Sequence, residues 1–559
     1  MPLSAVYTLP VELLSRVFVL GAAEPQSDSP FLLRPDDDHD PVASADFQLL
    51  VSHVCRHWRE VALRISCLWT SLHFREPAHI ARAEAFLGRV STNHSLDILV
   101  DTVSLDDHIP GVTLCRDEMR TIFALILPHV ARWRAFHLKV RANECKLVAR
   151  QALSTCGPAP RLETLQLYHF EDYRTAQNLY LATYRAPVVI FDNVLPALKN
   201  VSLIGVNLPW AHAPYLQQLH ALELALHPDS IRPPYDAWDA MLRRSPRLRR
   251  LRLHYSGPRA ADEDGTRICV PALEELSLTD LDPDHLSRLL RTLELPRLAT
   301  LALDLPEQDF TGVVEMIAGV GTPVASPAPP LPIAALHTLR ITALECDPAA
   351  LAALLRALAT LCVLELDFAR VRDPDAICDV LLECVALRLD AAPAEEPCEC
   401  AGARRAPVLP RLEEARLFGL GGARVRVLMA FRARFAEGCA CAGAEYPPSS
   451  ASSCSSPSSS ESAPAECAAR PASRLAIPSE GGGFDPGAGR PAMPRFTVRW
   501  SARRRGCDAV LDQLVRDGRV GWVDEDSDEV DDDDVNEGDS SGDEDGGPGP
   551  GDLEESDGE

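Results

Sequence analysis

The stretches "PALEELSL" (residues 271–278) and "PRLATLAL" (296–303) repeat one pattern, and that pattern decides the fold. Each opens with Pro, carries a Leu two residues later, and ends in Leu-x-Leu. Alternate residues of a strand point to the same side, so Leu-x-Leu gives a short strand one apolar face. The Pro ahead of it ends a preceding helix, because the residue before Pro is disfavoured in the helical conformation. The pattern therefore predicts short strands, each entered after a helix.

Further copies of this pattern run along most of the chain. The first Leu lies at 248, 273 and 298, and then at 336 and 361, so a step of 25 residues occurs three times. An irregular period of this size is typical of leucine-rich repeats. The other copies are "PRLETLQL" (160–167), "PALKNVSL" (196–203), "PRLRRLRL" (246–253) and "PRLEEARL" (410–417), with "LHTLRI" (336–341) and "LCVLEL" (361–366) lacking the Pro, and "WRAFHL" (133–138) and "LHALEL" (219–224) fitting more loosely.

Helical patterns lie between these strands. The clearest are "DPDHLSRLLRTLEL" (282–295), "DPAALAALLRALATL" (347–361) and "DPDAICDVLLECVAL" (373–387). Each opens with an Asp suited to capping a helix and a Pro suited to its first position. Alternating strands and capped helices predict an α/β fold, an irregular leucine-rich-repeat solenoid with parallel strands and short helices over residues 75–436. An ordinary two-layer α/β domain with Leu-rich strands is the alternative.

The C-terminal part of the chain changes in composition. Residues 437–494 are rich in Ser, Pro, Gly and Ala, which predicts a disordered linker. A strand pattern and a helix pattern predict a closing strand–helix unit over 495–523 that docks on the end of the solenoid. Residues 524–559 hold nineteen Asp and Glu and no Lys or Arg, which predicts a disordered acidic tail.

The net charge of −26 comes mostly from that tail, since about −7 remains on the other residues. Such a balance does not indicate a nucleic-acid-binding surface. Seventeen cysteines are spread thinly and mostly lie in apolar patterns, which favours a reducing compartment, the cytoplasm or the nucleus. No apolar run reaches the ~18 residues of a membrane span, so no membrane partner is expected.

The stretch "SHVCRHWREVA" (52–62) raises the question of a metal or nucleophile site, because it holds His53, Cys55 and His57. The apolar spacing of the stretch predicts one amphipathic helix. On a continuous helix, at about 100° per residue, Cys55 points away from both histidines, so the three side chains do not converge. Two Cys-x-Cys pairs, at 398–400 and 439–441, also lack the spacing of a zinc site. We therefore expect no metal, no cofactor and no catalytic activity.

A second short helix is predicted upstream, at "LPVELLSRVFVL" (9–20), and residues 22–45 resemble an inserted polar loop. Downstream lies "CLWTSLHF" (67–74). A module of this size has little core of its own, yet it carries many large apolar residues. Part of that apolar set should stay exposed and mark a surface for a partner protein.

These pieces together resemble the F-box, in particular the F-box-like domains of fungal proteins, over residues 7–74. The matching residues are Leu-Pro-x-Glu-Leu-Leu at 9–14, Val-Phe at 17–18, Val-Cys-x-x-Trp at 54–58 and Leu-Trp at 68–69. The insertion at 22–45 departs from the pattern, because most F-boxes have a tight connection there. The irregular repeats that follow are also similar to the leucine-rich regions of such proteins.

The resemblance implies a non-catalytic role in ubiquitination. An F-box binds a Skp-type adaptor, which links it to a cullin and a RING subunit, and the repeats hold a target protein. The resemblance implies that Leu9, Pro10, Leu13, Leu14, Val17 and Phe18 face the adaptor, and that Val54, Cys55, Trp58 and Trp69 close the module or join that interface. The alternative is a plain leucine-rich scaffold that binds basic partners through its acidic tail.

Overall fold

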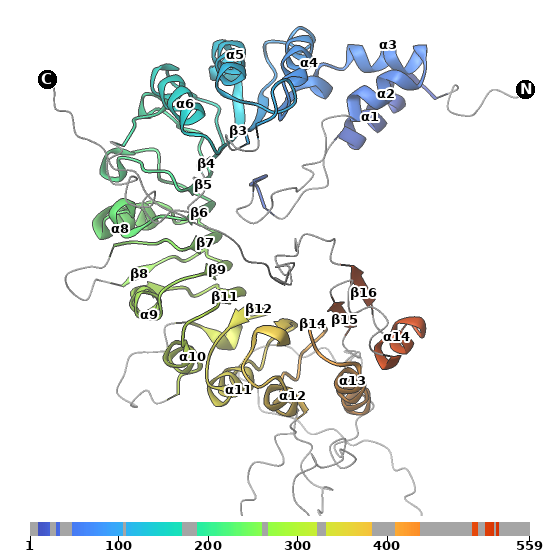
Figure 1. Cartoon of the computed structure of the whole chain (residues 1–559), viewed down its shortest axis with the longest axis vertical. Coiled ribbons are helices and arrows are strands. Elements are labelled where there is room, and N and C mark those ends of the chain that lie inside the picture. The colour runs from blue at the N-terminus through green and yellow to red at the C-terminus, as the bar shows by residue number, and fades with distance from the viewer. Residues whose placement is uncertain are drawn as a thin grey trace, which may run out of the picture.

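The computed structural model of the chain describes residues 9–22, 29–33, 47–103, 108–169, 187–259, 267–320, 331–382, 408–436, 495–500, 509–518 and 521–524. Over these ranges the fold is α/β, built on a 14-stranded sheet whose strands follow one another in chain order. Every recorded pairing in that sheet is parallel, from β1–β2 to β15–β16. The sheet curves into an arc, with helices along its outer side (Figure 1). The α/β class with parallel strands is therefore confirmed.

The strands of this sheet are short. They are β1 (Ser71–Phe74), β2 (Leu96–Asp101), β3 (Trp133–Val140), β4 (Thr164–His169), β5 (Asn200–Ile204), β6 (Ala221–Ala225), β7 (Arg250–His254), β9 (Glu275–Thr279), β11 (Thr300–Leu305), β12 (Thr338–Leu344), β13 (Val363–Asp367), β14 (Glu414–Phe418), β15 (Arg495–Trp500) and β16 (Gly521–Asp524). A separate parallel pair joins β8 (Ile268–Cys269) and β10 (Leu293–Glu294).

The helices described are mostly two to four turns long. They are α1 (Val11–Ala22), α2 (Phe47–Val54), α3 (Arg56–Arg64), α4 (Ala78–Leu87), α5 (Arg116–Ile126), α6 (Asn143–Thr155), α8 (Tyr235–Arg243), α9 (Pro283–Thr292), α10 (Thr311–Ala318), α11 (Pro348–Ala357), α12 (Pro374–Leu382), α13 (Gly422–Ala436) and α14 (Ala509–Arg516). None of the helices in the described ranges is long and apolar enough to cross a membrane.

The Leu-x-Leu patterns of neighbouring strands are aligned in register. Leu276 of β9 pairs with Leu251 of β7 and Leu301 of β11, and the row continues through Leu339 of β12 to Leu364 of β13. All five are buried between the sheet and the outer helices. Each added strand therefore extends one continuous layer of leucine side chains.

The Asp-Pro helix starts are confirmed. Asp282 accepts hydrogen bonds from the amides of residues 284 and 285 at 3.0 and 2.9 Å, and begins α9. Asp347 accepts one from the amide of Ala349 at 2.8 Å, and begins α11. Asp373 does the same for the amide of residue 376 at 3.0 Å, ahead of α12. These bonds satisfy amides that have no partner within the first helical turn.

The prediction of one helix through residues 52–62 is wrong. The chain breaks at Cys55, which lies between α2 and α3 in an extended conformation with φ −160° and ψ 169°. Its Sγ accepts a hydrogen bond from the amide of Trp58 at 3.4 Å, so Cys55 is the N-cap of α3. On either side of the break, Val51 of α2 and Val61 of α3 are buried in the same core.

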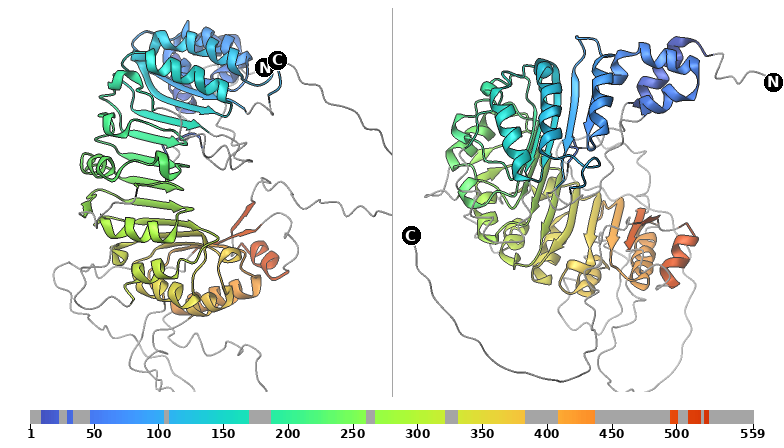
Figure 2. Two further views of the ribbon diagram at one scale, coloured as in Figure 1. Left: turned by 60° about the vertical axis from the view of Figure 1, so that its left-hand side comes forward. Right: turned by 45° about the horizontal axis from the view of Figure 1, so that its top comes forward.

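The three N-terminal helices share a core with the sheet. The indole of Trp69 donates a hydrogen bond to the carbonyl of Ala62 at 3.2 Å. Its ring meets Phe86 of α4 edge to face, with centroids 4.9 Å apart, and the guanidinium of Arg89 lies over it. Leu14 and Phe18 of α1 belong to the same buried cluster as the sheet leucines. The module is thus anchored at one end of the arc (Figure 2).

Part of the expected polar loop at 22–45 differs from that expectation. Phe31 and Leu33 are buried, and residues 29–33 lie inside the arc against the sheet (Figure 1).

At the C-terminal end of the sheet, β15 pairs with β14 in parallel, and β16 pairs with β15. The expected linker at 437–494, nearly all of the expected tail at 524–559, and Cys398, Cys400, Cys439 and Cys441 lie outside the described residues.

Candidate functional site

Helix α1 is apolar over most of its surface, with its polar side chains gathered on one face. Its polar side chains are Glu12, Ser15 and Arg16, and all the others of its twelve residues are apolar or Gly. An amphipathic helix normally turns its apolar side to the core of the protein. In α1 only Leu14 and Phe18 are buried, so most of its apolar side chains face solvent.

The exposed side chains form a stripe beside the buried face of α1. Leu13 and Val17, one turn apart, have 52% and 53% of their surface exposed. On the neighbouring helix α2, Leu50 and Val54 are also one turn apart, with 66% and 60% exposed. We call this set the N-terminal apolar surface; it comprises Leu9, Leu13, Val17, Leu20, Leu50 and Val54.

Helices α1 and α2 are in direct contact next to this surface. A Cβ atom built on Gly21 would lie 2.3 Å from the ring of Phe47, so a larger residue at this crossing would require that ring to move. Beneath it, Phe18 meets Trp58 of α3 edge to face, with ring centroids 5.0 Å apart. The contact between Phe18 and Trp58 joins α1 to α3, and the contact between Gly21 and Phe47 joins α1 to α2.

The structure divides the residues that the F-box resemblance implied. It leaves Leu9, Pro10, Leu13, Val17 and Val54 exposed, and Cys55 and Trp58 half-buried. It buries Leu14, Phe18 and Trp69 in the core of the chain. The expectation that Leu14 and Phe18 face a partner is wrong, because neither has surface left to offer. Trp69 closes the module.

The sequence interpretation missed Leu20 and Leu50. Leu20 lies seven residues after Leu13, and Leu50 lies four residues before Val54, so each shares a face with an exposed apolar residue. That spacing was available in the sequence. What it does not show is which side of each helix the rest of the chain covers.

A second candidate surface is the inner face of the sheet, where a polar row crosses β3 to β6. The imidazole Nδ1 of His137 lies 2.9 Å from the amide oxygen of Gln166. The Gln166 amide nitrogen donates to the hydroxyl of Ser202 at 3.2 Å, and that hydroxyl donates to Glu223 at 2.6 Å. Gln166 is fully buried at the centre of this row.

Residues 29–33 lie on this row and cover it. The amides of Leu32 and Leu33 donate to the Gln166 oxygen at 3.1 and 3.0 Å. The Gln166 nitrogen donates to the carbonyl of Leu33 at 2.7 Å. Since the oxygen receives two backbone amides, its identity is settled, and His137 must donate from Nδ1. The side chain of Gln166 thus binds the backbone of the segment in both directions.

The Leu33 side chain enters a small apolar cluster on the inner face. Its members are Leu99 of β2, Tyr168 of β4, Ile204 of β5 and Ala225 of β6, and they are separate from the main core. Burial lowers the pKa of His73 to about 4 and also lowers that of His137, so both are neutral at pH 7. These two histidines therefore place no charge under the segment; the charged groups nearby are Glu223, bonded to Ser202, and Lys139, which lies over the Tyr168 ring.

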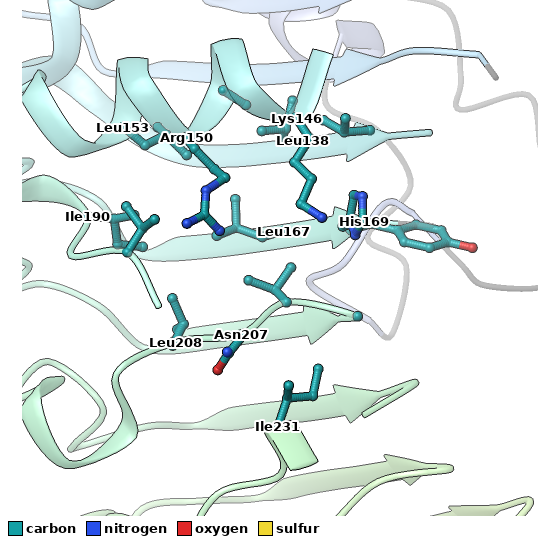
Figure 3. Close-up of a pocket in the computed structure, with 16 residues that line it drawn as sticks. Leu138, Lys146, Arg150, Leu153, Leu167, His169, Ile190, Asn207, Leu208 and Ile231 are labelled. Carbon is teal, nitrogen blue, oxygen red and sulfur yellow. The ribbon is translucent and has the colours of Figure 1, made fainter. Parts of the chain in front are cut away.

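A small cavity lies on the other side of the sheet, between α6 and strands β3 to β5 (Figure 3). Its volume is about 90 Å³, and its walls include Leu138, Leu153, Leu167, Ile190 and Leu208. Lys146, Arg150 and His169 extend into the same region. Sites for small molecules usually measure ~300 Å³ or more, so this space is too small for a typical ligand.

The buried thiols are not prepared for nucleophilic chemistry. Burial raises the pKa of Cys145 to about 12 and that of Cys378 to about 11. A thiol is reactive as the thiolate, which these sites disfavour at neutral pH. Within the described ranges, no group of three or more His, Cys, Asp or Glu side chains is placed to hold a metal ion.

Two comparisons were negative for this chain. No protein-family model matches it, and no curated protein is similar to it. The two surfaces described above are therefore the candidate functional sites of the chain.

Proposed function

We propose that this chain is the substrate receptor of an SCF-type ubiquitin ligase, with a Skp-type adaptor bound at its N-terminal helices. The observation that carries the proposal is the N-terminal apolar surface. An apolar patch of this kind on a small helical module is typical of a protein-binding site. Five of the residues that the F-box resemblance assigns to the module, Leu9, Pro10, Leu13, Val17 and Val54, are exposed there.

We also propose that the parallel sheet is an irregular leucine-rich-repeat solenoid that holds the target. Two features support this: the strands follow chain order, and the leucines of successive units are in register. In such arrays the concave side is the usual binding surface. A receptor of this design performs no chemistry; it raises the local concentration of target lysines near the loaded conjugating enzyme.

Co-purification of the full chain with a Skp-type adaptor tests the proposal. The full chain is required, because the N-terminal helices share their core with the sheet. Leu13→Asp should lower adaptor affinity by about 30-fold or more, the effect of losing an interface hot spot. Leu147→Asp on α6 is the matched control, because Leu147 is equally apolar and 66% exposed on another helix.

Two results would contradict the proposal. One is failure of the unaltered chain to bind the adaptor at all. The other is equal loss of binding with the substitutions at 13 and 147. If partner capture instead disappears when residues 525–559 are deleted, the scaffold that binds basic proteins through its acidic tail is the better description.

A further inference from the structure

We propose that the inner face over β2 to β6 is a binding site for an extended peptide with an aliphatic side chain, and that residues 29–33 occupy it as a built-in competitor. The competing peptide is an extended segment of the target protein. This choice of partner rests on the proposed function. The existence of the site itself stands on the contacts of Gln166 and Leu33. The inference adds to the receptor proposal the chemistry of the target segment: an extended backbone with one aliphatic side chain.

The contacts to the segment are of a kind that any extended peptide can make. Gln166 binds a backbone carbonyl and two backbone amides, at 2.7, 3.1 and 3.0 Å. Such bonds do not depend on side-chain identity. Selectivity comes from the cluster around Leu33, which accepts one aliphatic side chain. A backbone clamp plus a single side-chain pocket is a general way of binding peptides.

The amide that makes this clamp is held in position before the peptide binds. His137 donates to its oxygen from one side, at 2.9 Å. Ser202 accepts from its nitrogen on the other side, and is itself held by Glu223. A clamp fixed by neighbouring strands loses little conformational freedom when a peptide arrives.

The apolar cluster stands out from the rest of the inner face. Further along the sheet the inner face carries ion pairs such as Arg252–Glu275 at 3.1 Å and Arg416–Glu365 at 3.4 Å. On β2 to β6 the inner face carries charged side chains too, Lys139 and Glu223, but it also holds the apolar cluster of Leu99, Tyr168, Ile204 and Ala225. An apolar patch on a concave surface requires an apolar cover.

The present cover is not part of the sheet. Phe31, Leu32 and Leu33 join no strand ladder, and their recorded hydrogen bonds to the sheet all go to Gln166. Strands β3, β4 and β5 pair fully with one another beneath the segment. Residues 31–33 can therefore dissociate from the inner face without breaking a hydrogen bond between strands. A segment that competes with a peptide for the site must be able to do so.

A peptide-binding measurement tests the proposal. The probe is a fluorescent synthetic peptide with the sequence of residues 27–36, and the acceptor is the full chain with Phe31→Gln and Leu33→Gln, which removes the apolar anchors of the built-in segment. Anisotropy should show binding at least about tenfold tighter than to the unaltered chain, where the tethered segment competes at high effective concentration. Adding Gln166→Ala should weaken it again by at least about tenfold.

The same peptide with Asp in place of Leu33 is the control, and it should not bind. Three results would overturn the proposal: no binding to the doubly substituted chain, equal binding to the unaltered chain, or binding that is indifferent to Gln166. The assay contains no adaptor. Loss of peptide binding with intact adaptor binding rejects the inner-face site alone, whereas the reverse result rejects the proposed function alone.

Hydrogen exchange in the unaltered chain gives a second test that does not require the substitutions to fold. The amides of Leu32 and Leu33 should exchange through local opening, faster than the β4 amides of Leu165 and Leu167 beneath them. Equal protection of the segment and the strand would mean that residues 29–33 are a permanent part of the fold, and would overturn the competitor role.

Discussion

Leu13 and Leu14 are adjacent in α1 but have opposite environments: Leu13 is 52% exposed, whereas Leu14 is 1% exposed. The helix turns about 100° between them, enough to move one side chain out of the core. Leu14 stands in the same buried row as Phe18, and Leu13 in the same exposed row as Val17. The helix therefore has a folding face and a separate face for a partner, and substitutions can distinguish them.

The two faces predict opposite stability results. Phe18→Ala removes a fully buried ring that contacts Trp58, and should lower the free energy of unfolding by about 3–5 kcal/mol. Leu13→Asp changes an exposed position and should stay within about 0.5 kcal/mol of the unaltered chain. Denaturant titration measures both. A large loss of stability from Leu13→Asp would mean that this residue belongs to the core and not to a docking surface.

Helix capping gives a second prediction. Asp282→Ala should destabilise the chain by about 1 kcal/mol, because two amides of α9 lose their acceptor. Asp284→Ala is the control: this residue is also in the first turn of α9, but it caps no amide there, and only its favourable interaction with the helix dipole, about 0.3–1 kcal/mol, is lost. If the two substitutions lower the free energy of unfolding equally, the cap at Asp282 contributes nothing beyond its charge.

The repeat strands and their helices could be predicted from sequence because their signals are local. Leu276 and Leu278 alternate within one strand, and Asp282 with Pro283 marks the next helix, all within a few residues. The order of the strands in the sheet could be predicted as well, because successive units of similar sequence pair with their neighbours. The strand and helix of one repeat could be predicted without knowledge of any residue outside that repeat.

The break at Cys55 could not be predicted in that way. Val51, Val54 and Trp58 keep a helical period across it, so the period alone predicts one helix. The break depends on the extended conformation of Cys55 and its bond to the amide of Trp58. A Cys at an N-cap is also a weaker signal than Ser or Asp.

The inner-face site was hidden for another reason. Leu33 and its partner Gln166 are 133 residues apart, and nothing near either one indicates the other. The composition around residues 29–33 is polar, which predicts a solvated loop. Burial of a short segment by a distant side chain appears only when the whole arc is assembled.

Two glycines predict effects of opposite sign. Gly205 has φ +63°, and a Cβ there would lie 2.3 Å from the carbonyl oxygen of His169. Gly205→Ala should therefore destabilise the chain by about 1–3 kcal/mol. Gly312 lies in α10 with open space around it, so Gly312→Ala should stabilise by about 0.5–1 kcal/mol. Thermal unfolding compares the pair, and a stabilising Gly205→Ala would contradict the close contact between β4 and β5.

Buried histidines predict a loss of stability in mild acid. Burial lowers the pKa of His73, His169, His227 and His285 to about 4, against about 6.5 in an unfolded chain. Between these values the unfolded chain binds more protons than the folded one, so the folded state loses stability as the pH falls from 6.5 towards 4. From pH 7.5 to 5.5 the loss should be on the order of 1 kcal/mol per histidine.

His227 is the best site at which to check this effect. Its Nε2 donates to the carbonyl of Val206 at 3.1 Å, which leaves Nδ1 to accept from Ser256 at 2.8 Å. The contact in which Nδ1 accepts from Ser256 requires the neutral ring, and a glutamine amide offers one donor and one acceptor of similar reach. Between pH 7.5 and 5.5, the unfolding free energy of the His227→Gln chain should therefore fall by on the order of 1 kcal/mol less than that of the unaltered chain. Denaturant titration at the two pH values measures this difference. An unfolding free energy that is the same at both pH values in the unaltered chain would mean that these histidines are not held neutral by the fold.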